Sequence, residues 1–274
     1  MKKIASLFFV VFIVFGCSHN AITGRNQLSL YPESDIQAMA NEQYKQFLTS
    51  NKVVSQSVGN KDAAMVRRVG ERIAGAITNY YAQQGLSKEL EGYKWEYNLV
   101  DSKEVNAWCM PGGKIVVYTG ILPITQNETA LAIVLGHEIT HALARHGNER
   151  MSQAMVQQLG GAALSVAMEN QPTETQSLFM NAYGIGSNVG ALLPFSRKQE
   201  YEADRLGLRF AAMAGYDPRE AIAFWQRMKA ASGTNKAPEI LSTHPIDDNR
   251  IAKLQEEMPE ALTYYKPENM QKSQ

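Results

Sequence analysis

Apolar residues recur at helical spacing in the first part of the chain and then alternate with polar ones. A capping box, Ser34-x-x-Gln37, opens the first helical run, and a second run with the same spacing follows it. Further on, alternation typical of strands replaces this spacing, and Pro111-Gly112-Gly113 separates two such stretches as a hairpin turn would. We therefore expect helices over 34–47 and 62–85 and strands over 93–99, 105–110 and 114–118.

The second half of the chain is dominated by helical patterns. Thr125-x-x-Glu128 reads as a capping box before a strongly apolar helix that should stop near Gly147. Residues 151–168 carry no charge but hold Gln and Ser, which indicates a buried or dimer-contact helix rather than a membrane span. The Gly-, Asn- and Ser-rich stretch 170–197 is expected to be a mobile loop and a candidate lid. Two more helices are expected, over 198–214 and from Asp217-Pro218 onward.

The amino terminus has the layout of a secretory signal peptide. Lys2 and Lys3 precede an apolar run, 4–15, which at ~1.5 Å per residue is too short to span a bilayer core of ~30 Å. The run ends at Gly16-Cys17, which resembles a bacterial lipobox and makes Cys17 the predicted lipidation site. An uncleaved anchor helix is the alternative.

Composition narrows the functional class. The 274 residues are 45% hydrophobic and 20% charged, as in ordinary globular proteins, and 27 basic residues balance 27 acidic ones. A neutral chain lacks the basic surface that nucleic-acid binding requires, so we expect no nucleic-acid partner. Two cysteines exclude a disulfide-rich scaffold, and with Cys17 acylated, Cys109 would be a free, buried thiol.

The apolar helix contains the sequence His137-Glu138-Ile139-Thr140-His141. At ~100° per residue the two histidines lie ~40° apart and one turn along, so both imidazoles can bind one metal ion. Glu138 falls within the same arc of ~100° and can serve as a general base. A pair of histidines that pack without metal is the alternative. The opposite side of the helix should face the core with Leu131, Leu135, Ile139, Ala142 and Leu143.

A catalytic zinc site needs a third protein ligand and an open position. Glu200 and Asp204 lie four residues apart on one face of the next predicted helix but one. Glu200 could bind the metal, and Asp204 could accept an imidazole N–H. Glu202 is ~200° from Glu200, and His146 is ~180° from His137, so both are expected to lie outside the site. A solvated acidic face is the alternative for the carboxylates.

Several segments, taken in order, make the chain resemble a known family. Together they cover most of residues 23–255. The chain resembles the zinc metallopeptidases of family forty-eight, the gluzincin group that includes HtpX and the CAAX prenyl proteases, and within it the short periplasmic lipoproteins. The segments are Thr23-Gly24-Arg25, Asn106-Ala107 with Pro111-Gly112-Gly113-Lys114, His137–His141, Glu200-x-x-x-Asp204 and Ser242-Thr243-His244-Pro245.

The resemblance implies an α+β, mostly helical, zincin-like domain with a small antiparallel sheet beside the metal-binding helix. It assigns one Zn²⁺ per chain to His137, His141 and Glu200, with Asp204 supporting the site. It places His244 near the metal, either as a fourth ligand that silences the enzyme or as a catalytic group that stabilises the oxyanion. Arg250 would have a structural or oxyanion role.

We therefore expect a metalloendopeptidase that cleaves unfolded or misassembled envelope proteins at the periplasmic side of a bacterial membrane. Its lipid anchor would hold it there, and Ser18 favours the outer membrane. The uncharged stretch 151–168 makes an oligomer possible. A non-catalytic zinc-stabilised chaperone and a hydrolase of non-peptide bonds are the alternatives. The edge strand would bind an extended substrate through Asn106, Ala107, Gly112 and Gly113. The expected divisions are a signal peptide (1–16), a tether (17–30), the peptidase domain (31–258) and a polar tail (259–274).

Overall fold

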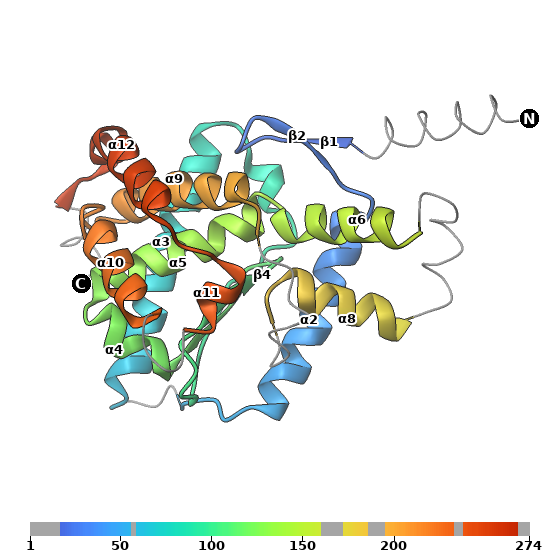
Figure 1. Ribbon diagram of the computed structural model, residues 1–274, viewed down its shortest axis with the longest axis horizontal. Coiled ribbons are helices and arrows are strands. Elements are labelled where there is room, and N and C mark those ends of the chain that lie inside the picture. The colour runs from blue at the N-terminus through green and yellow to red at the C-terminus, as the bar shows by residue number, and fades with distance from the viewer. Residues whose placement is uncertain (1–16, 56–58, 160–171, 186–194, 233–237, 268–274) are drawn as a thin grey trace, which may run out of the picture.

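The computed structural model describes residues 17–55, 59–159, 172–185, 195–232 and 238–267 (Figure 1). The predicted signal peptide therefore lies outside the described residues. The strands are β1 (Cys17–Asn20), β2 (Arg25–Leu28), β3 (Glu96–Val100), β4 (Ala107–Met110) and β5 (Lys114–Tyr118). The helices are α2 (Glu33–Ser50), α3 (Lys61–Gln83), α4 (Leu122–Thr125), α5 (Glu128–Leu143), α6 (His146–Leu159), α8 (Pro172–Ala182), α9 (Arg197–Met213), α10 (Glu220–Ser232), α11 (Ile240–Thr243) and α12 (Asp248–Tyr264), with short 3₁₀ turns at Ser87–Leu90 and Thr119–Ile121. The predicted mostly helical α+β class is confirmed.

The central sheet has the strand order β3-β5-β4. β4 and β5 form the predicted antiparallel hairpin, but β5 turns back into the middle of the sheet and pairs in parallel with β3. The sheet is therefore mixed: the expected antiparallel pair lies beside α5, and a parallel pair completes the sheet. Alternate residues of β4 and β5 enter two separate hydrophobic clusters, so both faces of the sheet are covered. One cluster involves α3, α5 and α9, and the other involves α2, α6 and α8.

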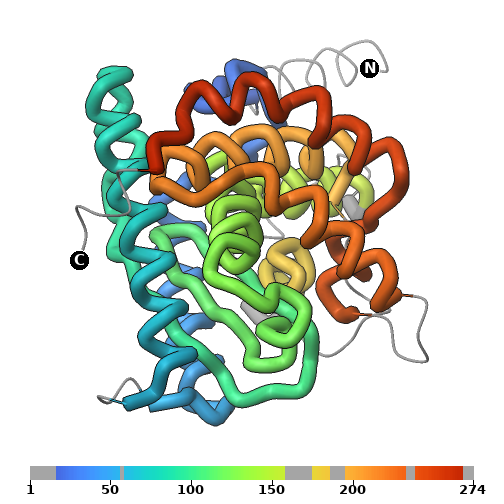
Figure 2. Tube along the Cα trace, turned by 90° about the vertical axis from the view of Figure 1, so that its left-hand side faces the viewer, coloured from blue at the N-terminus to red at the C-terminus, as the bar shows by residue number. Residues whose placement is uncertain are grey.

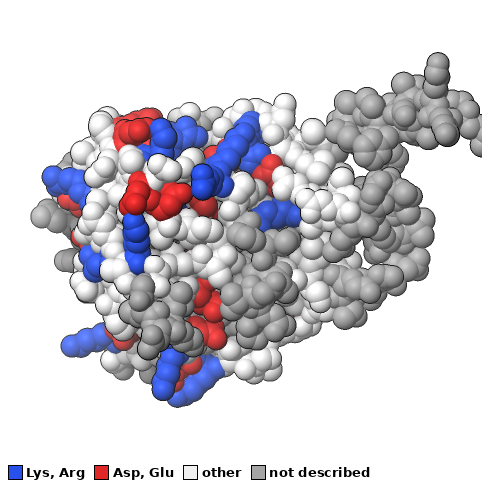
Figure 3. All heavy atoms as spheres, viewed as in Figure 1, with Lys and Arg blue, Asp and Glu red and all other residues white. Residues whose placement is uncertain are grey.

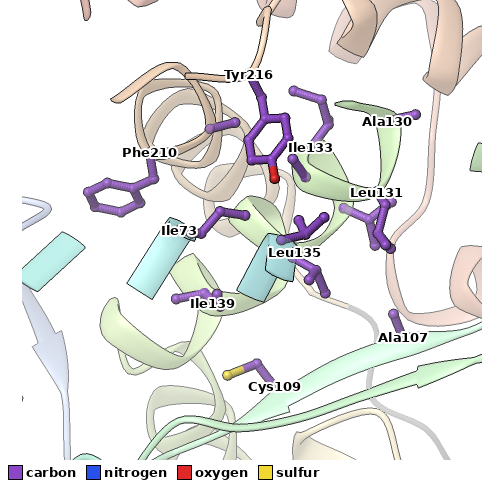
Figure 4. Packing of buried hydrophobic residues seen from close by; sticks show 14 of the residues in the cluster. Ile73, Ala107, Cys109, Ala130, Leu131, Ile133, Leu135, Ile139, Phe210 and Tyr216 are labelled. Carbon is purple, nitrogen blue, oxygen red and sulfur yellow. The ribbon is translucent and has the colours of Figure 1, made fainter. Parts of the chain in front are cut away.

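Helix α5 is buried along its length and is the centre of the fold. The residues predicted to face the core do so, and Figure 4 shows Leu131, Leu135 and Ile139 on the side toward Cys109 of β4. α9 crosses α5 where two glycines meet: a Cβ built on Gly136 would lie 2.7 Å from the Gly207 carbonyl oxygen. Only glycine allows backbones this close, and the crossing places the carboxylates of α9 beside the histidines of α5. Figure 2 shows α12 lying over α9 on the side away from α5.

The N-terminal segment 17–28 is a folded hairpin rather than the predicted tether. β1 and β2 pair in antiparallel register from Cys17↔Leu28 to Asn20↔Arg25, and the strands join at a turn that contains Gly24 in the left-handed region (φ 71°). The turn makes polar contacts with the helical body, which are described below. We call residues 17–28 the N-terminal hairpin.

Some predicted boundaries are wrong for local reasons. α2 begins at Glu33 after Pro32, so Ser34 does not cap it, and Asn127 rather than Thr125 caps α5 by accepting from Ala130 N–H. Residues 172–182 of the predicted loop form α8, while 186–194 lie outside the described residues. The predicted tail is helical as far as Tyr264 because Ala261 packs into the core.

The remaining elements agree more closely with expectation. α9 starts as predicted, with a capping box between Ser196 and Gln199. Among the described residues, no helix has both the length and the apolar content needed to cross a membrane. Basic and acidic side chains are interspersed on the face shown in Figure 3.

Candidate metal centre

Four buried side chains from three segments converge on one point. His137 and His141 come from α5, Glu200 from α9 and His244 from the residue that ends α11, and each is at most 4% exposed. One nitrogen or oxygen of each lies within 4.8 Å of those of the others. The predicted convergence of Glu200 with the two histidines is therefore present in the fold, and His244 lies beside them as expected.

The spacing of these atoms matches a tetrahedral ion. A tetrahedron with metal–ligand bonds of about 2.0–2.1 Å has edges of about 3.4 Å. His141 Nε2 lies 3.1 Å from His137 Nε2 and 3.3 Å from Glu200 Oε1. His137 Nε2 lies 3.6 Å from Glu200 Oε2, and His244 Nδ1 lies 3.2 Å from His137 Nε2 and 3.0 Å from Glu200 Oε1. Three imidazole nitrogens and the Glu200 carboxylate, whose Oε1 faces His141 and His244 and whose Oε2 faces His137, lie at separations that suit Zn²⁺.

The protonation states also suit a metal. Burial lowers the pKa of His141 well below its ordinary value, which keeps the imidazole neutral as a metal requires. Burial on its own would raise the pKa of Glu200, but the positive charge of Arg250 holds that pKa well below the usual range. Glu200 is therefore an ionised carboxylate inside the protein.

His137 is held from behind by a short chain of contacts. Its Nδ1 lies 2.9 Å from Asp204 Oδ1, and Arg250 donates to both oxygens of Asp204 at 2.6 and 2.8 Å. Another Arg250 nitrogen lies 2.6 Å from Glu200 Oε2, and the guanidinium stacks over Trp225 with 4.1 Å to the ring centroid. Asp204 thus sits where the sequence predicts. Arg250 binds the two carboxylates behind the metal donors, which accords with the structural alternative for its role.

His141 is held by a longer series of contacts, and here the structure shows that one prediction from the sequence is wrong. His146 Nδ1 lies 2.9 Å from His141 Nδ1, and His146 Nε2 lies 3.0 Å from Glu202 Oε2. The prediction excluded His146 by extending α5 to Gly147, whereas α5 ends at Leu143 and Arg145 adopts a left-handed conformation (φ 55°). This break turns His146 back toward His141. Glu202 does face away from Glu200, but it reaches the metal centre through His146.

Glu138 is positioned to exchange protons. It is 3% exposed, and its Oε1 has no hydrogen-bond partner among the described residues. Burial raises its pKa, a shift that His244 and His137 oppose. Its other oxygen lies 3.8 Å from His244 Nε2. A buried carboxylate with one oxygen free of hydrogen-bond partners, beside a metal site, is a suitable general base.

Phe195 packs against the metal donors and was missed from the sequence. Its ring centroid lies 3.9 Å from that of His141 and 4.8 Å from that of His244. The guanidinium carbon of Arg150 lies 3.7 Å from the centroid of Phe195. Phe195 is a single aromatic residue one position before the Ser196 cap, so spacing alone could not indicate its place.

The residues predicted to bind substrate lie around β4. Asn106 is buried and its side-chain oxygen accepts from Ala107 N–H at 2.9 Å. Ala107 opens β4 and packs into the core. Gly112 and Gly113 form the β4–β5 turn with φ of 78° each, and their carbonyls accept from Lys94 and Glu96. The two glycines therefore have a clear structural function in the turn, and the substrate contacts of all four stay a prediction.

Comparison with known proteins agrees with this geometry. A family model described as "Peptidase family M48" matches residues 60–258. The chain is 42% identical over 171 residues to the "Mitochondrial metalloendopeptidase OMA1" of Schizosaccharomyces pombe, covering 61% of this chain and 48% of that protein. It is 32% identical over 270 residues to the "Metalloendopeptidase OMA1, mitochondrial" of Bos taurus, covering 94% and 49%.

A bacterial relative is more distant. The "Beta-barrel assembly-enhancing protease" of Escherichia coli is 28% identical over 166 residues, which cover 58% of this chain and 33% of that protein. The chain thus spans about half or less of the length of these curated relatives. The family match covers most of the chain and includes the described zinc donors, so the chain belongs to peptidase family M48, the zinc metallopeptidases.

Proposed function

We propose that this protein is a zinc-dependent metalloendopeptidase that cleaves unfolded or damaged proteins. The observation that carries the proposal is the convergence of His137, His141 and Glu200 at metal-ligand spacing, next to the buried carboxylate of Glu138, whose Oε1 has no hydrogen-bond partner among the described residues. A purely structural zinc site has no use for such a carboxylate oxygen one residue after a ligand.

The chain supplies the proton transfers of peptide hydrolysis. Zn²⁺ held by these residues would polarise the scissile carbonyl and lower the pKa of water. Glu138 takes a proton from the attacking water and returns it to the departing amine, so the carboxylate is regenerated.

The position of β4 supports an extended substrate. β4 pairs with β5 on one side only among the described strands, and it packs against α5. β4 is buried, and a peptide that adds to its outer edge would form backbone hydrogen bonds that do not depend on the peptide sequence. Such binding selects chains whose backbone is exposed, which is the property of unfolded proteins.

The expected location rests on the first residues of this chain. The apolar run before Cys17 supports export and lipid attachment at the periplasmic side of a bacterial membrane. Relatives named for mitochondria and for β-barrel assembly belong to the same group of matches. Labelling with a radioactive fatty acid tests the anchor: the wild type should incorporate label and Cys17→Ser should not.

Exchange of Glu138 for Gln tests the activity. We expect E138Q to keep the fold and one zinc per chain but to lose digestion of unfolded casein by at least ~10³-fold, because the base is gone. Equal digestion by E138Q would exclude this mechanism. A wild type that binds unfolded casein without cleaving it would favour the chaperone alternative, and cleavage of small esters alone would favour a non-peptide hydrolase.

The position of His244 favours the resting fourth ligand over the catalytic alternative. Its Nδ1 lies 3.2 Å from His137 Nε2 and 3.0 Å from Glu200 Oε1, at the remaining corner of the tetrahedron. A histidine there occupies the place that a substrate carbonyl or water needs. We expect His244→Ala to digest casein faster than the wild type, whereas slower digestion would assign His244 a catalytic role.

A further inference from the structure

The N-terminal hairpin contacts each of the helices that surround His141. The Asn20 side chain donates to the carbonyl of Leu143 at the last residue of α5, with 3.2 Å between the atoms. Arg25 donates to Glu149 of α6 at 2.7 and 2.6 Å and to Glu202 of α9 at 2.7 and 2.9 Å. One short hairpin thus ties together the helix with the histidines, the helix that presents His146 and the helix with Glu200.

Arg25 is well shielded where it joins α6 to α9. Its side chain is 14% exposed, and those of Glu149 and Glu202 are 10% and 11% exposed. Glu149 also accepts from Gln199 at 2.7 Å, and Gln199 belongs to the capping box immediately before Glu200. The guanidinium therefore reaches the start of α9 by two routes.

His146 and Glu202 connect His141 to Arg25, and metal binding by His141 sets the direction of each hydrogen bond between them. When His141 binds metal through Nε2, its proton is on Nδ1 and is donated to Nδ1 of His146. His146 then carries its proton on Nε2 and donates it to Glu202. Glu202 accepts from Arg25 as well, so it is held as a carboxylate.

We propose that Arg25, Glu202 and His146 are positioning residues for the zinc ligand His141, and that the N-terminal hairpin is therefore part of the metal centre. We call these three residues the hairpin relay. Hydrogen-bonded partners of a ligating histidine fix its tautomer and ring orientation, and their loss typically weakens metal binding ~10–100-fold. This inference rests on the proposed zinc enzyme and adds the N-terminal segment to its working parts.

The test measures zinc release from the full-length protein to a chromogenic chelator, together with the visible spectrum of the Co²⁺-substituted protein. We expect Glu202→Gln and Arg25→Gln to release zinc ~10-fold faster than the wild type and to alter the Co²⁺ bands. His146→Leu should release it fastest. His146→Gln should release zinc more slowly than His146→Leu, because an amide can accept from His141 and donate to Glu202.

Arg209→Gln is the matched control. Arg209 is 15% exposed like Arg25 and also lies on the arginine side of an ion pair with α12, at 2.6 Å from Glu260 and 3.6 Å from Glu257, but these partners are 52% and 34% exposed. We expect R209Q to lower the melting temperature by less than R25Q does. Its zinc release and Co²⁺ bands should be like those of the wild type.

Two results would overturn the hairpin relay. One is zinc release and Co²⁺ bands at wild-type values in R25Q, E202Q and H146L, and the other is an equal change in R209Q. If the wild type holds zinc and E138Q loses hydrolysis while the relay variants behave like R209Q, only this inference fails. If the wild type holds no zinc, the proposed function fails with it.

Discussion

The two zinc-binding histidines of α5 are supported in different ways. His137 meets a carboxylate directly, with 2.9 Å between its Nδ1 and Asp204, and Arg250 completes a buried unit whose members are at most 6% exposed. His141 meets its carboxylate, Glu202, only through a second imidazole, and the arginine that completes this unit belongs to the N-terminal hairpin.

The difference separates a fixed side of the metal centre from an adjustable one. Both sides end in an acidic acceptor and an arginine, and the His141 side has an additional imidazole between the ligand and the carboxylate. On the His137 side, Asp204 of α9 and Arg250 of α12 are both buried, so removal of one charge leaves another unpaired in the interior. The His141 side extends to a short two-stranded element near the surface, so its perturbation should weaken metal binding by smaller steps.

The largest effect is expected on the fixed side. Asp204→Ala leaves Arg250 facing Glu200 alone, and we expect the free energy of unfolding to fall by about 3–5 kcal/mol. Zinc release should accelerate more than in Arg25→Gln. Urea unfolding of the zinc-free protein and chelator competition measure the two quantities. Asp204→Asn keeps an acceptor for His137, so both of its values should lie between those of the wild type and D204A. A smaller loss of unfolding free energy in D204A than in R25Q would contradict the assignment of the His137 side as the fixed one.

A smaller effect is expected where α9 crosses α5. A Cβ on Gly207 would lie 2.8 Å from the His137 backbone nitrogen, so Gly207→Ala must separate the helices and move Asp204 away from His137. We expect a loss of about 1–3 kcal/mol in unfolding free energy, with faster zinc release. Gly75→Ala is the control, because Gly75 is an exposed position of α3 where a Cβ meets nothing within 4 Å, and it should gain about 0.5–1 kcal/mol in unfolding free energy. Unchanged unfolding free energy and zinc release in G207A would show that the two helices are not closely packed at this crossing.

The smallest effect is expected on the adjustable side, where the free energy of unfolding should depend on pH through Glu33. Burial raises the pKa of Glu33 to about 7, and Glu33 faces Arg145 at the turn that presents His146. The folded state therefore holds a proton that the unfolded state has released, so the free energy of unfolding should fall as pH rises from about 4.5 to 7. We expect this fall to be on the order of 1 kcal/mol in the wild type and to be absent in Glu33→Gln. Urea unfolding at pH 4.5 and 8 measures it; parallel curves for E33Q and wild type would contradict the assignment.

Much of the metal centre could be predicted from the sequence, because its donors lie at fixed spacing within single helices. His137, His141 and the pair Glu200 and Asp204 each follow from helical periodicity and known ligand chemistry. His244 and Arg250 required the family resemblance, since they lie in a different segment. Helices α3 and α9 and the β4–β5 hairpin were also expected close to their observed bounds.

The remainder depends on breaks and distant contacts that no local pattern records. His146 joins the centre because α5 stops short at Arg145, and a continuous helix would have pointed it elsewhere. Arg25 sits in a polar stretch that reads as a tether, although its partners are 124 and 177 residues further along the chain. The parallel pairing of β3 with β5 likewise depends on which strand takes the central place, which strand composition does not specify.

X-ray absorption at the zinc edge of the full-length protein measures the ligands of the proposed metal ion. We predict one zinc per chain surrounded by imidazole nitrogens and a carboxylate oxygen at about 2.0–2.1 Å, with one imidazole fewer in His244→Ala. A chain that retains no zinc after purification in its presence, or a shell with sulfur at about 2.3 Å, would contradict it.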